Sequence, residues 1–225
     1  MIDMSYSFDF TGLQQGYDSL LEGLKVTVQL TLAANLMGIT LGFVVALLVM
    51  SRIKIIRTPV MLFIEFFRCT PAIIQIVWFF YCVPILFDVY LDSITMGVLA
   101  LGLNLTAFNA EAYRAAIQSV PKEQHDAGIA LGLSPFQRII YIVLPHALRA
   151  SLPVLITNGI GIFQQTALVA IVAIQDLMYQ GKSLATTTYR PIETFTLIAV
   201  IYFAVSFPIA QLVQFIERRR EVASR

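Results

Sequence analysis

The chain has 225 residues, of which 58% are hydrophobic and only 13% charged, and its mean hydropathy is +0.78. Because a soluble domain is about half apolar and about a quarter charged, this composition excludes an ordinary soluble protein and predicts a membrane protein. The formal net charge of +1 gives no reason to expect a nucleic-acid partner. At this length the membrane spans leave no room for a separate soluble domain.

Five apolar runs are long enough to cross the hydrocarbon, which takes a helix of about 20 residues. The polar and aromatic start, residues 1–25, lacks the features of a signal peptide and is expected to form a short lead-in helix. Gly38 and Gly42 in the first run form a G-x3-G pattern that predicts close helix packing. A polar connection, 176–193, separates the last two runs. The sequence thus predicts one all-α transmembrane domain, 1–225, with spans at about 26–50, 58–87, 94–117, 150–174 and 194–216.

The charges of the loops predict the orientation of these spans. Cytoplasmic loops carry an excess of Lys and Arg. With the amino terminus outside, the inner segments carry ten basic residues and the outer segments three, so the carboxyl terminus is expected in the cytoplasm. The inner residues are Arg52, Lys54, Arg57, Lys122, Arg138, Arg149, Arg218, Arg219, Arg220 and Arg225, and the outer ones are Lys25, Lys182 and Arg190.

The insert at about 119–149 mixes polar and apolar residues and is predicted to lie on the cytoplasmic side. Lys122 to Leu131 can form a short helix, and Gly132 followed by Ser134 and Pro135 supplies a helix stop and a second helix start. This helix–turn–helix carries a small apolar patch that either contacts a protein partner or rests on lipid headgroups. The patch consists of Ala127, Ala130, Leu131 and Leu133, ringed by Asp126, Lys122 and Gln137.

Polar residues inside the apolar runs are candidates for a substrate pathway. Arg68 is costly in a membrane and must face a partner or a wet cavity. Glu65, three residues earlier, can pair with it on the same helix face, and the alternative is that Arg68 receives a substrate carboxylate. Gln164, Gln165 and Thr166 offer the same choice between hydrogen bonds to other helices and weak contacts to a substrate.

Motifs of enzymes and metal sites are not found in the sequence. The Gly181-Lys182-Ser183 fragment is not a phosphate loop, because Asp176 stands where that motif needs its first glycine. His125 and His146 have no ligand set at metal-binding spacing, so no metal is expected. A membrane enzyme is disfavoured because no nucleophile arrangement, paired-carboxylate site or dinucleotide fingerprint is present.

The segment from Asp126 to Pro145 resembles the EAA loop of the permease subunits of ABC importers, E-A-A-x3-G-x9-I-x-L-P, at every spacing. It departs from that pattern at Asp126, where Glu is usual, and at Gly128, where the second Ala is usual. Glycine is expected to loosen the helix by about 0.5 to 1 kcal/mol relative to alanine.

Three further stretches narrow the resemblance to the histidine, glutamine and glutamate/aspartate type of bacterial permease. EAYRAAIQSVPKEQ from Glu111 is similar to the E-x-Y-R-x-x-I-Q-S-V-P run of polar amino acid permeases. FFRCTP, ending at Pro71, is similar to F-R-G-T-P, with Cys69 in place of glycine. GIFQQTALV from Gly161 is similar to the L-K-D-T-S-L region.

This resemblance implies a type I ABC importer fold with a cytoplasmic coupling helix, in a subunit of the bacterial inner membrane. Such a subunit takes a polar amino acid, with glutamate, aspartate and glutamine favoured, from a periplasmic binding protein. It works with a second permease subunit and with separate cytoplasmic ATPases that bind ATP and Mg²⁺, and has no cofactor itself. An ATPase-independent secondary transporter or channel is the alternative, although the internal repeats typical of secondary transporters are not seen. The coupling residues implied are Asp126, Ala127, Gly128, Ala130, Leu131, Gly132, Ser134, Pro135 and Phe136.

Overall fold

The computed structural model describes residues 16–223, with the side chains of 125, 216 and 218–223 left out of the description. Most of the lead-in helix expected over 1–25 therefore lies outside the described residues. From Tyr17 onward the expectation of a separate helix is wrong, because α1 runs from Tyr17 to Val49 without a break and includes the start of the first span.

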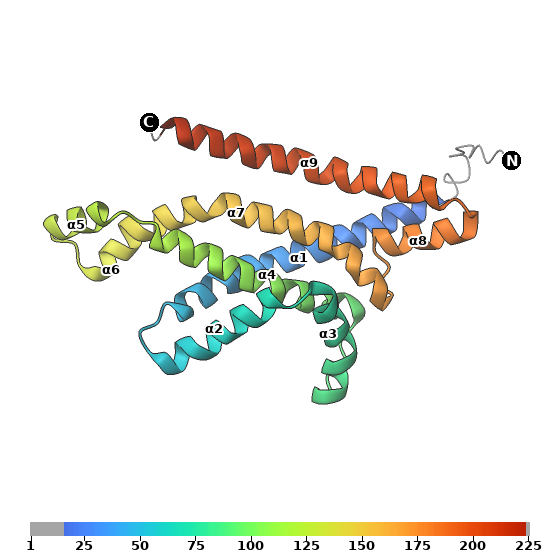
Figure 1. Cartoon of the computed structure of the whole chain (residues 1–225), viewed down its shortest axis with the longest axis horizontal. Helices are drawn as coiled ribbons and strands as arrows, with labels where there is room; N and C mark the ends of the chain where they lie inside the picture. The colour runs from blue at the N-terminus through green and yellow to red at the C-terminus, as the bar shows by residue number, and fades with distance from the viewer. Residues whose placement is uncertain (1–15, 224–225) are drawn as a thin grey trace, which may run out of the picture.

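The described residues form helices and no strands, arranged as an elongated bundle (Figure 1). Two segments are not α-helical: η2 is a π-helix and η3 a 3-10 helix. The elements are α1 (Tyr17–Val49), α2 (Lys54–Cys69), α3 (Ala72–Phe87), α4 (Ser93–Gln118), α5 (Lys122–Ala130), α6 (Pro135–Arg138), η2 (Ile139–Val143), α7 (Leu144–Gln165), η3 (Thr166–Val172), α8 (Leu177–Thr188) and α9 (Pro191–Ala223).

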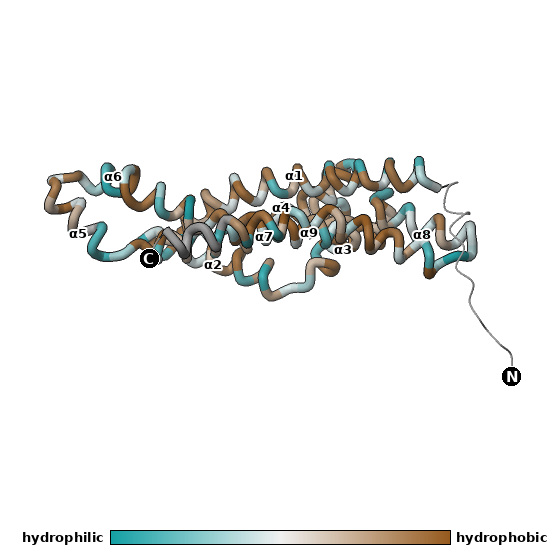
Figure 2. Tube along the Cα trace, turned by 90° about the horizontal axis from the view of Figure 1, so that it is seen from above, coloured by the Kyte–Doolittle hydropathy of each residue, from teal (hydrophilic) through white to brown (hydrophobic). Residues whose placement is uncertain are grey.

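Four helical segments are long and apolar enough to cross a membrane, and α2 with α3 makes a fifth if this bent pair is one span. Hydrophobic residues follow the middle of the bundle, whereas hydrophilic residues gather towards its ends, around α5 and α6 at one and α8 at the other (Figure 2). The expected all-α membrane fold with about five spans is confirmed.

The segment predicted as one span over 58–87 is bent by 110° between α2 and α3. Pro71 has no N–H group, so the carbonyl of Phe67, four residues earlier, lacks its partner within the helix. Gln75 Nε2 donates to that carbonyl at 2.9 Å and Asn104 Nδ2 donates to it at 3.2 Å. Asn104 also donates to Gln75 Oε1 at 3.0 Å. This buried network provides hydrogen-bond donors for the Phe67 carbonyl at the bend and connects the bend to α4 through Asn104.

The fourth apolar run begins earlier than the predicted 150–174, because 135–172 forms one continuous helical segment of 38 residues. The wider turn of η2, in which Leu144 N–H bonds to the Ile139 carbonyl, comes just before Pro145. Pro145 has no N–H group to bond to an earlier carbonyl, and the altered hydrogen-bond pattern of η2 directly before it accommodates this gap without ending the helix. The end of the insert therefore continues directly into the membrane span.

The core is built where α1 crosses the central helix α4. Gly38 packs against Leu105, and a Cβ atom at Gly42 would come within 2.8 Å of Asn109 Cβ. The two glycines therefore let the helices approach closely, which confirms the prediction from the G-x3-G pattern. The largest buried cluster contains Leu30, Ala34, Ile76, Leu101, Leu105, Ile162 and Val169.

The connection expected over 176–193 contains a helix, α8, that the sequence analysis did not predict. Asp176 begins it, because its carboxylate accepts a hydrogen bond from Tyr179 N–H at 2.9 Å. Thr27 of α1 accepts another from Leu177 N–H at 3.1 Å. Asp176 lies outside the spans and is fully buried, and this burial raises the pKa of its carboxyl group to about 6.

Candidate functional site

A helix–turn–helix of α5 and α6, here called the coupling bundle (residues 122–138), projects from one end of the molecule (Figure 1). Its turn is closed by Gly132, which has a φ of +73°. Leu133 N–H bonds to the Gly128 carbonyl at 3.0 Å and Gly132 N–H to the Ile129 carbonyl at 2.9 Å. These two bonds pair backbone carbonyl groups in the last turn of α5, and the left-handed backbone conformation at position 132 favours glycine.

The second helix of the bundle starts with a capping box. Gln137 N–H donates to Ser134 Oγ at 3.3 Å, and Ser134 N–H donates to Gln137 Oε1 at 2.9 Å. Pro135 occupies the first turn, where its missing N–H group costs nothing. The predicted helix stop at Gly132 and helix start at Ser134 and Pro135 are both confirmed.

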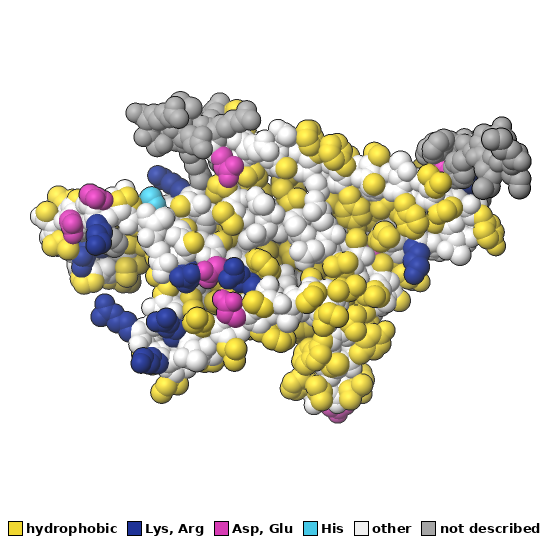
Figure 3. All heavy atoms as spheres, viewed as in Figure 1, with side chains coloured by type: hydrophobic (Ala, Val, Ile, Leu, Met, Phe, Trp, Pro, Cys, Tyr) yellow, Lys and Arg dark blue, Asp and Glu magenta, His cyan; other side chains and the backbone are white. Residues whose placement is uncertain are grey.

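Eight of the nine predicted coupling residues are exposed at this end of the molecule. Two of them are large and apolar: Leu131 is 78% exposed and Phe136 is 71% exposed. Ile129, which is 57% exposed, lies beside them in the sequence. Figure 3 shows hydrophobic and charged side chains together on this end. An apolar tip that projects beyond the spans is a surface suited to a protein partner.

Gly128, which stands where the EAA pattern has its second alanine, is the one buried member of the set. A Cβ atom there would lie 2.7 Å from Ile142 Cδ1 and 3.1 Å from Arg138 Cγ. Glycine therefore lets α5 pack closely on the segment that leads into α7. Since both contacts are with flexible side chains, an alanine at this position needs only a small shift.

Charged side chains of both signs gather between α2 and α4: Glu65 and Arg68 on α2 face Glu111 and Arg114 on α4. Arg68 Nη1 lies 3.7 Å from Glu65 Oε1. Arg114 forms a bidentate ion pair with Glu111, which has the same spacing of three residues. All four side chains are partly exposed. The internal pair of Glu65 and Arg68 expected from their spacing is thus observed, and the cluster as a whole carries both signs of charge.

Two cavities adjoin this charge cluster. One, of about 320 Å³, is lined by Glu65, Glu111 and Arg114. The other, of about 460 Å³, is lined by Arg68 and by Asn158 of α7. Arg68 also lies over the ring of Phe108 of α4, at 5.9 Å from the centroid. The cluster can therefore offer both a cation and a carboxylate to a solute in the adjacent space.

Glu111 and Arg114 were not among the predicted pathway residues, although their spacing matches that of Glu65 and Arg68. The spacing of this pair is visible in the sequence, but only the fold shows that α2 and α4 bring the two ion pairs together. Gln164, Gln165 and Thr166 lie instead where α7 passes into η3, and neither cavity beside Arg68 includes them. Thr166 is buried and donates to the Phe163 carbonyl at 2.7 Å, whereas Gln164 is exposed. The predicted pathway residues thus fall into two separate groups.

Comparison with known proteins places this arrangement among transport proteins. Residues 38–222 match the family described as "Binding-protein-dependent transport system inner membrane component". The glutamine transport system permease protein GlnP of Escherichia coli (strain K12) is 29% identical over 216 residues, which cover 96% of this chain and 99% of GlnP. The arginine ABC transporter permease protein ArtQ of Haemophilus influenzae is 33% identical over 187 residues, which cover 80% of this chain and 84% of ArtQ.

A solved structure of an amino acid transporter also matches this chain. The crystal structure of an amino acid ABC transporter with histidines contains a chain that is 31% identical and superposes with a TM-score of 0.88. The match covers 95% of this chain and 99% of that one. The fold is therefore that of a type I ABC importer permease.

Proposed function

The chain belongs to the binding-protein-dependent transport system inner membrane components, and from this premise we propose that it is the permease subunit of an ATP-driven importer of polar amino acids. The substrate class is supported by the glutamine and arginine permeases among its relatives. The observation that carries the proposal is the capped coupling bundle, which exposes an apolar tip and continues without a break into a membrane span. Neither the family nor the fold favours a secondary transporter or channel.

The partners follow from the surfaces of the chain. Separate cytoplasmic ATPase subunits, which bind ATP and Mg²⁺, receive the coupling bundle, with Leu131 and Phe136 as its most exposed apolar contacts. A second permease subunit completes the pathway, and a periplasmic binding protein delivers the amino acid. This chain holds no cofactor of its own and does no chemistry on the substrate.

The proposed orientation in the inner membrane puts the amino terminus outside and the carboxyl terminus in the cytoplasm. It is supported by the excess of basic residues in the segments assigned to the inner side. In Figure 3 the Lys and Arg side chains gather at the end that carries the coupling bundle and the start of α2. The coupling bundle and the start of α2 lie towards the same end of the molecule, which supports the proposal that both face the cytoplasm.

Closure of the ATPases on ATP would push the coupling bundle. Because α6, η2 and α7 form one helical segment, a displacement of the coupling bundle moves this span directly. The spans α4 and α7 and the bent pair α2–α3 then change the side of the membrane to which the pathway opens. The energy of ATP binding shifts this equilibrium only if the ATPases contact the bundle differently in the two states.

An amino acid carries an ammonium and a carboxylate, and the charge cluster offers a partner to each. Arg68 is the proposed partner of the carboxylate, and Glu65 and Glu111 are proposed partners of the ammonium. Gln164, Gln165 and Thr166 are proposed as weaker polar contacts at the far end of α7, away from the coupling bundle.

The substitution Leu131→Asp tests the coupling role. We expect amino acid uptake by the complete importer to fall at least tenfold, because a carboxylate would be buried at an apolar contact. The ATPase subunit should also be lost on affinity purification of the permease in mild detergent. Ile55→Asp is the matched control, since Ile55 is 87% exposed on α2 and lies outside the coupling bundle. Equal uptake and equal ATPase recovery in the two variants would refute the assignment.

A further inference from the structure

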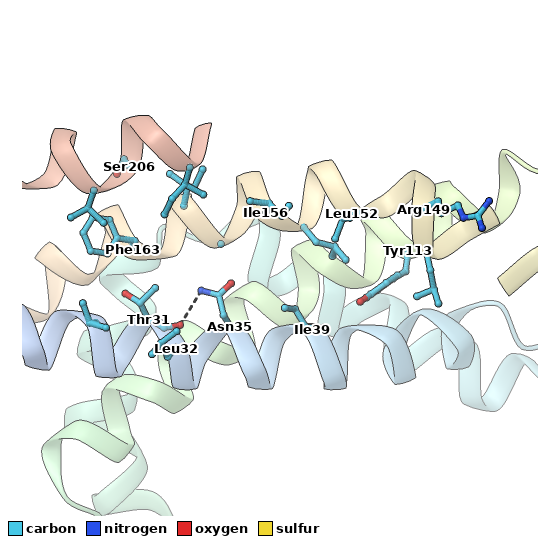
Figure 4. A pocket seen from close by; sticks show the side chains of 17 residues that line it. Thr31, Leu32, Asn35, Ile39, Tyr113, Arg149, Leu152, Ile156, Phe163 and Ser206 are labelled. Atoms are coloured by element: carbon cyan, nitrogen blue, oxygen red, sulfur yellow. Dashed lines mark hydrogen bonds between the residues drawn. The ribbon is translucent and has the colours of Figure 1, made fainter. Parts of the chain in front are cut away.

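A long cavity of about 690 Å³ lies between α1, α7 and α9 (Figure 4). It runs along α1 from Val28 to Ile39 and along α7 from Leu148 to Phe163. On the third side, α9 contributes Val205 and is the least buried of the spans. The cavity is separate from the charge cluster, and no residue of that cluster lines it.

The lining of this cavity is almost entirely apolar. Its two polar residues on α1 are turned back on their own helix: Asn35 Nδ2 donates to the Thr31 carbonyl at 2.9 Å, the dashed line in Figure 4, and Thr31 Oγ1 donates to the Thr27 carbonyl at 2.7 Å. Ser206 of α9 and Tyr113 of α4 each add one hydroxyl group. Such a lining cannot replace the hydration of an amino acid's two charges, so the polar substrate is a poor occupant.

The dimensions of the cavity accommodate a hydrocarbon chain. At a rise of 1.5 Å per residue, the lined stretches of α1 and α7 are about 16 and 22 Å long, close to the roughly 15 Å of hydrocarbon in one leaflet. Spread over that length, the volume leaves a mean cross-section of about 30 to 45 Å². A single hydrocarbon chain fits a passage of this width and length, so the cavity can hold an acyl chain along α1 and α7.

A positive charge lies at one end of the cavity. Arg149 lines the cavity at this end, as labelled in Figure 4. It also lines a second cavity, beside the coupling bundle, whose walls include Ala127 and His146. This end is the cytoplasmic one if the orientation under the proposed function holds. Guanidinium groups bind phosphate oxygens through paired hydrogen bonds, and basic pockets between spans on this side hold anionic lipid headgroups.

We propose that the cavity between α1, α7 and α9 binds an anionic phospholipid of the inner leaflet, with one acyl chain in the groove and its phosphate at Arg149. The acyl chain fills a space between α9 and α1 that would otherwise be unpacked. The lipid is thus a component of the folded permease rather than part of the bulk bilayer. This placement of the headgroup rests on the proposed orientation.

The test uses the complete importer reconstituted in nanodiscs with a trace of phosphatidylglycerol whose acyl chain carries a photoreactive diazirine. We expect the label to map to α1 and α7 residues that line the cavity, such as Leu32 and Ile156. The variant Val205→Trp fills the groove and should lower this labelling at least tenfold. The matched control, Val200→Trp, lies on the same helix at a position 55% exposed and should label as the wild type does.

Two further comparisons separate this proposal from the transport function. Arg149→Gln should lower the preference for phosphatidylglycerol over phosphatidylcholine by about tenfold, while Leu152→Trp should act as a second filling variant. Labelling confined to outward-facing residues, or displacement of the probe by a transported amino acid, would overturn the lipid assignment. A wild-type importer that is labelled at the cavity but takes up no amino acid would count against the transport proposal alone.

Discussion

The bend between α2 and α3 should depend on Gln75, and Gln75→Met tests this dependence. Methionine keeps the length and apolar stem of glutamine but removes its hydrogen bonds. The two N–H groups of Gln75 Nε2 are shared among the Phe67 carbonyl, the Thr70 carbonyl and Thr70 Oγ1, at 2.9, 3.1 and 2.6 Å, and Gln75 Oε1 accepts from Asn104 at 3.0 Å. The side chain therefore makes the equivalent of three hydrogen bonds.

The expected loss can be estimated from these bonds. A hydrogen bond between membrane residues contributes about 0.6 kcal/mol on average, so three of them give roughly 2 kcal/mol. For a chain of this size, each kcal/mol lowers the unfolding midpoint by about 2 to 4 °C. We therefore expect the variant to unfold about 4 to 8 °C below wild type. Uptake should also fall, because Arg68 lies one turn before the bend.

Thermal unfolding of the purified importer, followed by loss of the intact complex on size exclusion, provides the measurement. Thr40→Val is the control, since the Thr40 hydroxyl bonds only to carbonyls of its own helix and is exposed; its midpoint should stay within about 1 °C. Asn104→Leu should give a smaller loss than Gln75→Met because it removes two bonds of the same network. A Gln75→Met midpoint equal to that of the control would refute the reasoning.

Three other predictions follow from single positions. Gly132→Ala should destabilise the coupling bundle by about 1 to 2 kcal/mol, and Gly132→Asn by less. A Cβ atom at this position meets no atom within 4 Å, so only the backbone conformation is strained. ATPase stimulation by substrate should therefore decrease in the order Gly, Asn, Ala. The pKa of Asp176 is raised from an ordinary 3.8 to about 6, so the folded state favours the protonated carboxyl group. The free energy of unfolding should therefore fall by up to about 3 kcal/mol as the pH rises from about 4 through 6. Asp176→Asn should remove this pH dependence from unfolding curves over the same range. Gly42→Val should separate α1 from α4 and lower the yield of intact complex, whereas Gly161→Val, where a Cβ meets nothing within 4 Å, should not.

Features with a local cause could be predicted from the sequence. The turn of the coupling bundle depends on Gly132, Ser134 and Pro135, which act through their own backbone and their nearest neighbours. The close contact of α1 and α4 is marked by Gly38 and Gly42 because small residues serve the same purpose in most membrane bundles. Each signal is complete within a few residues, so no knowledge of the fold is required.

Features that depend on distant residues could not be predicted in the same way. Pro71 marks an interruption, but Asn104, 33 residues later, helps to hold the bend that follows. The second ion pair of the charge cluster, Glu111 and Arg114, gains its place only when α4 packs on α2. The start of α8 carried a weak local signal in Asp176, yet the polar composition of the segment concealed its buried side, which includes Leu177 and Leu184.

The continuous segment from Pro135 to Val172 has a geometric consequence for the scale of the motion. At 1.5 Å per residue its 38 residues measure about 57 Å, nearly twice the roughly 30 Å of hydrocarbon that it crosses. A rotation of about 10° around its midpoint would displace each end by about 5 Å, close to the 5.4 Å pitch of a helix. Thr166, about 19 Å from the midpoint, would then move by about 3 Å, which is more than half of one helical pitch.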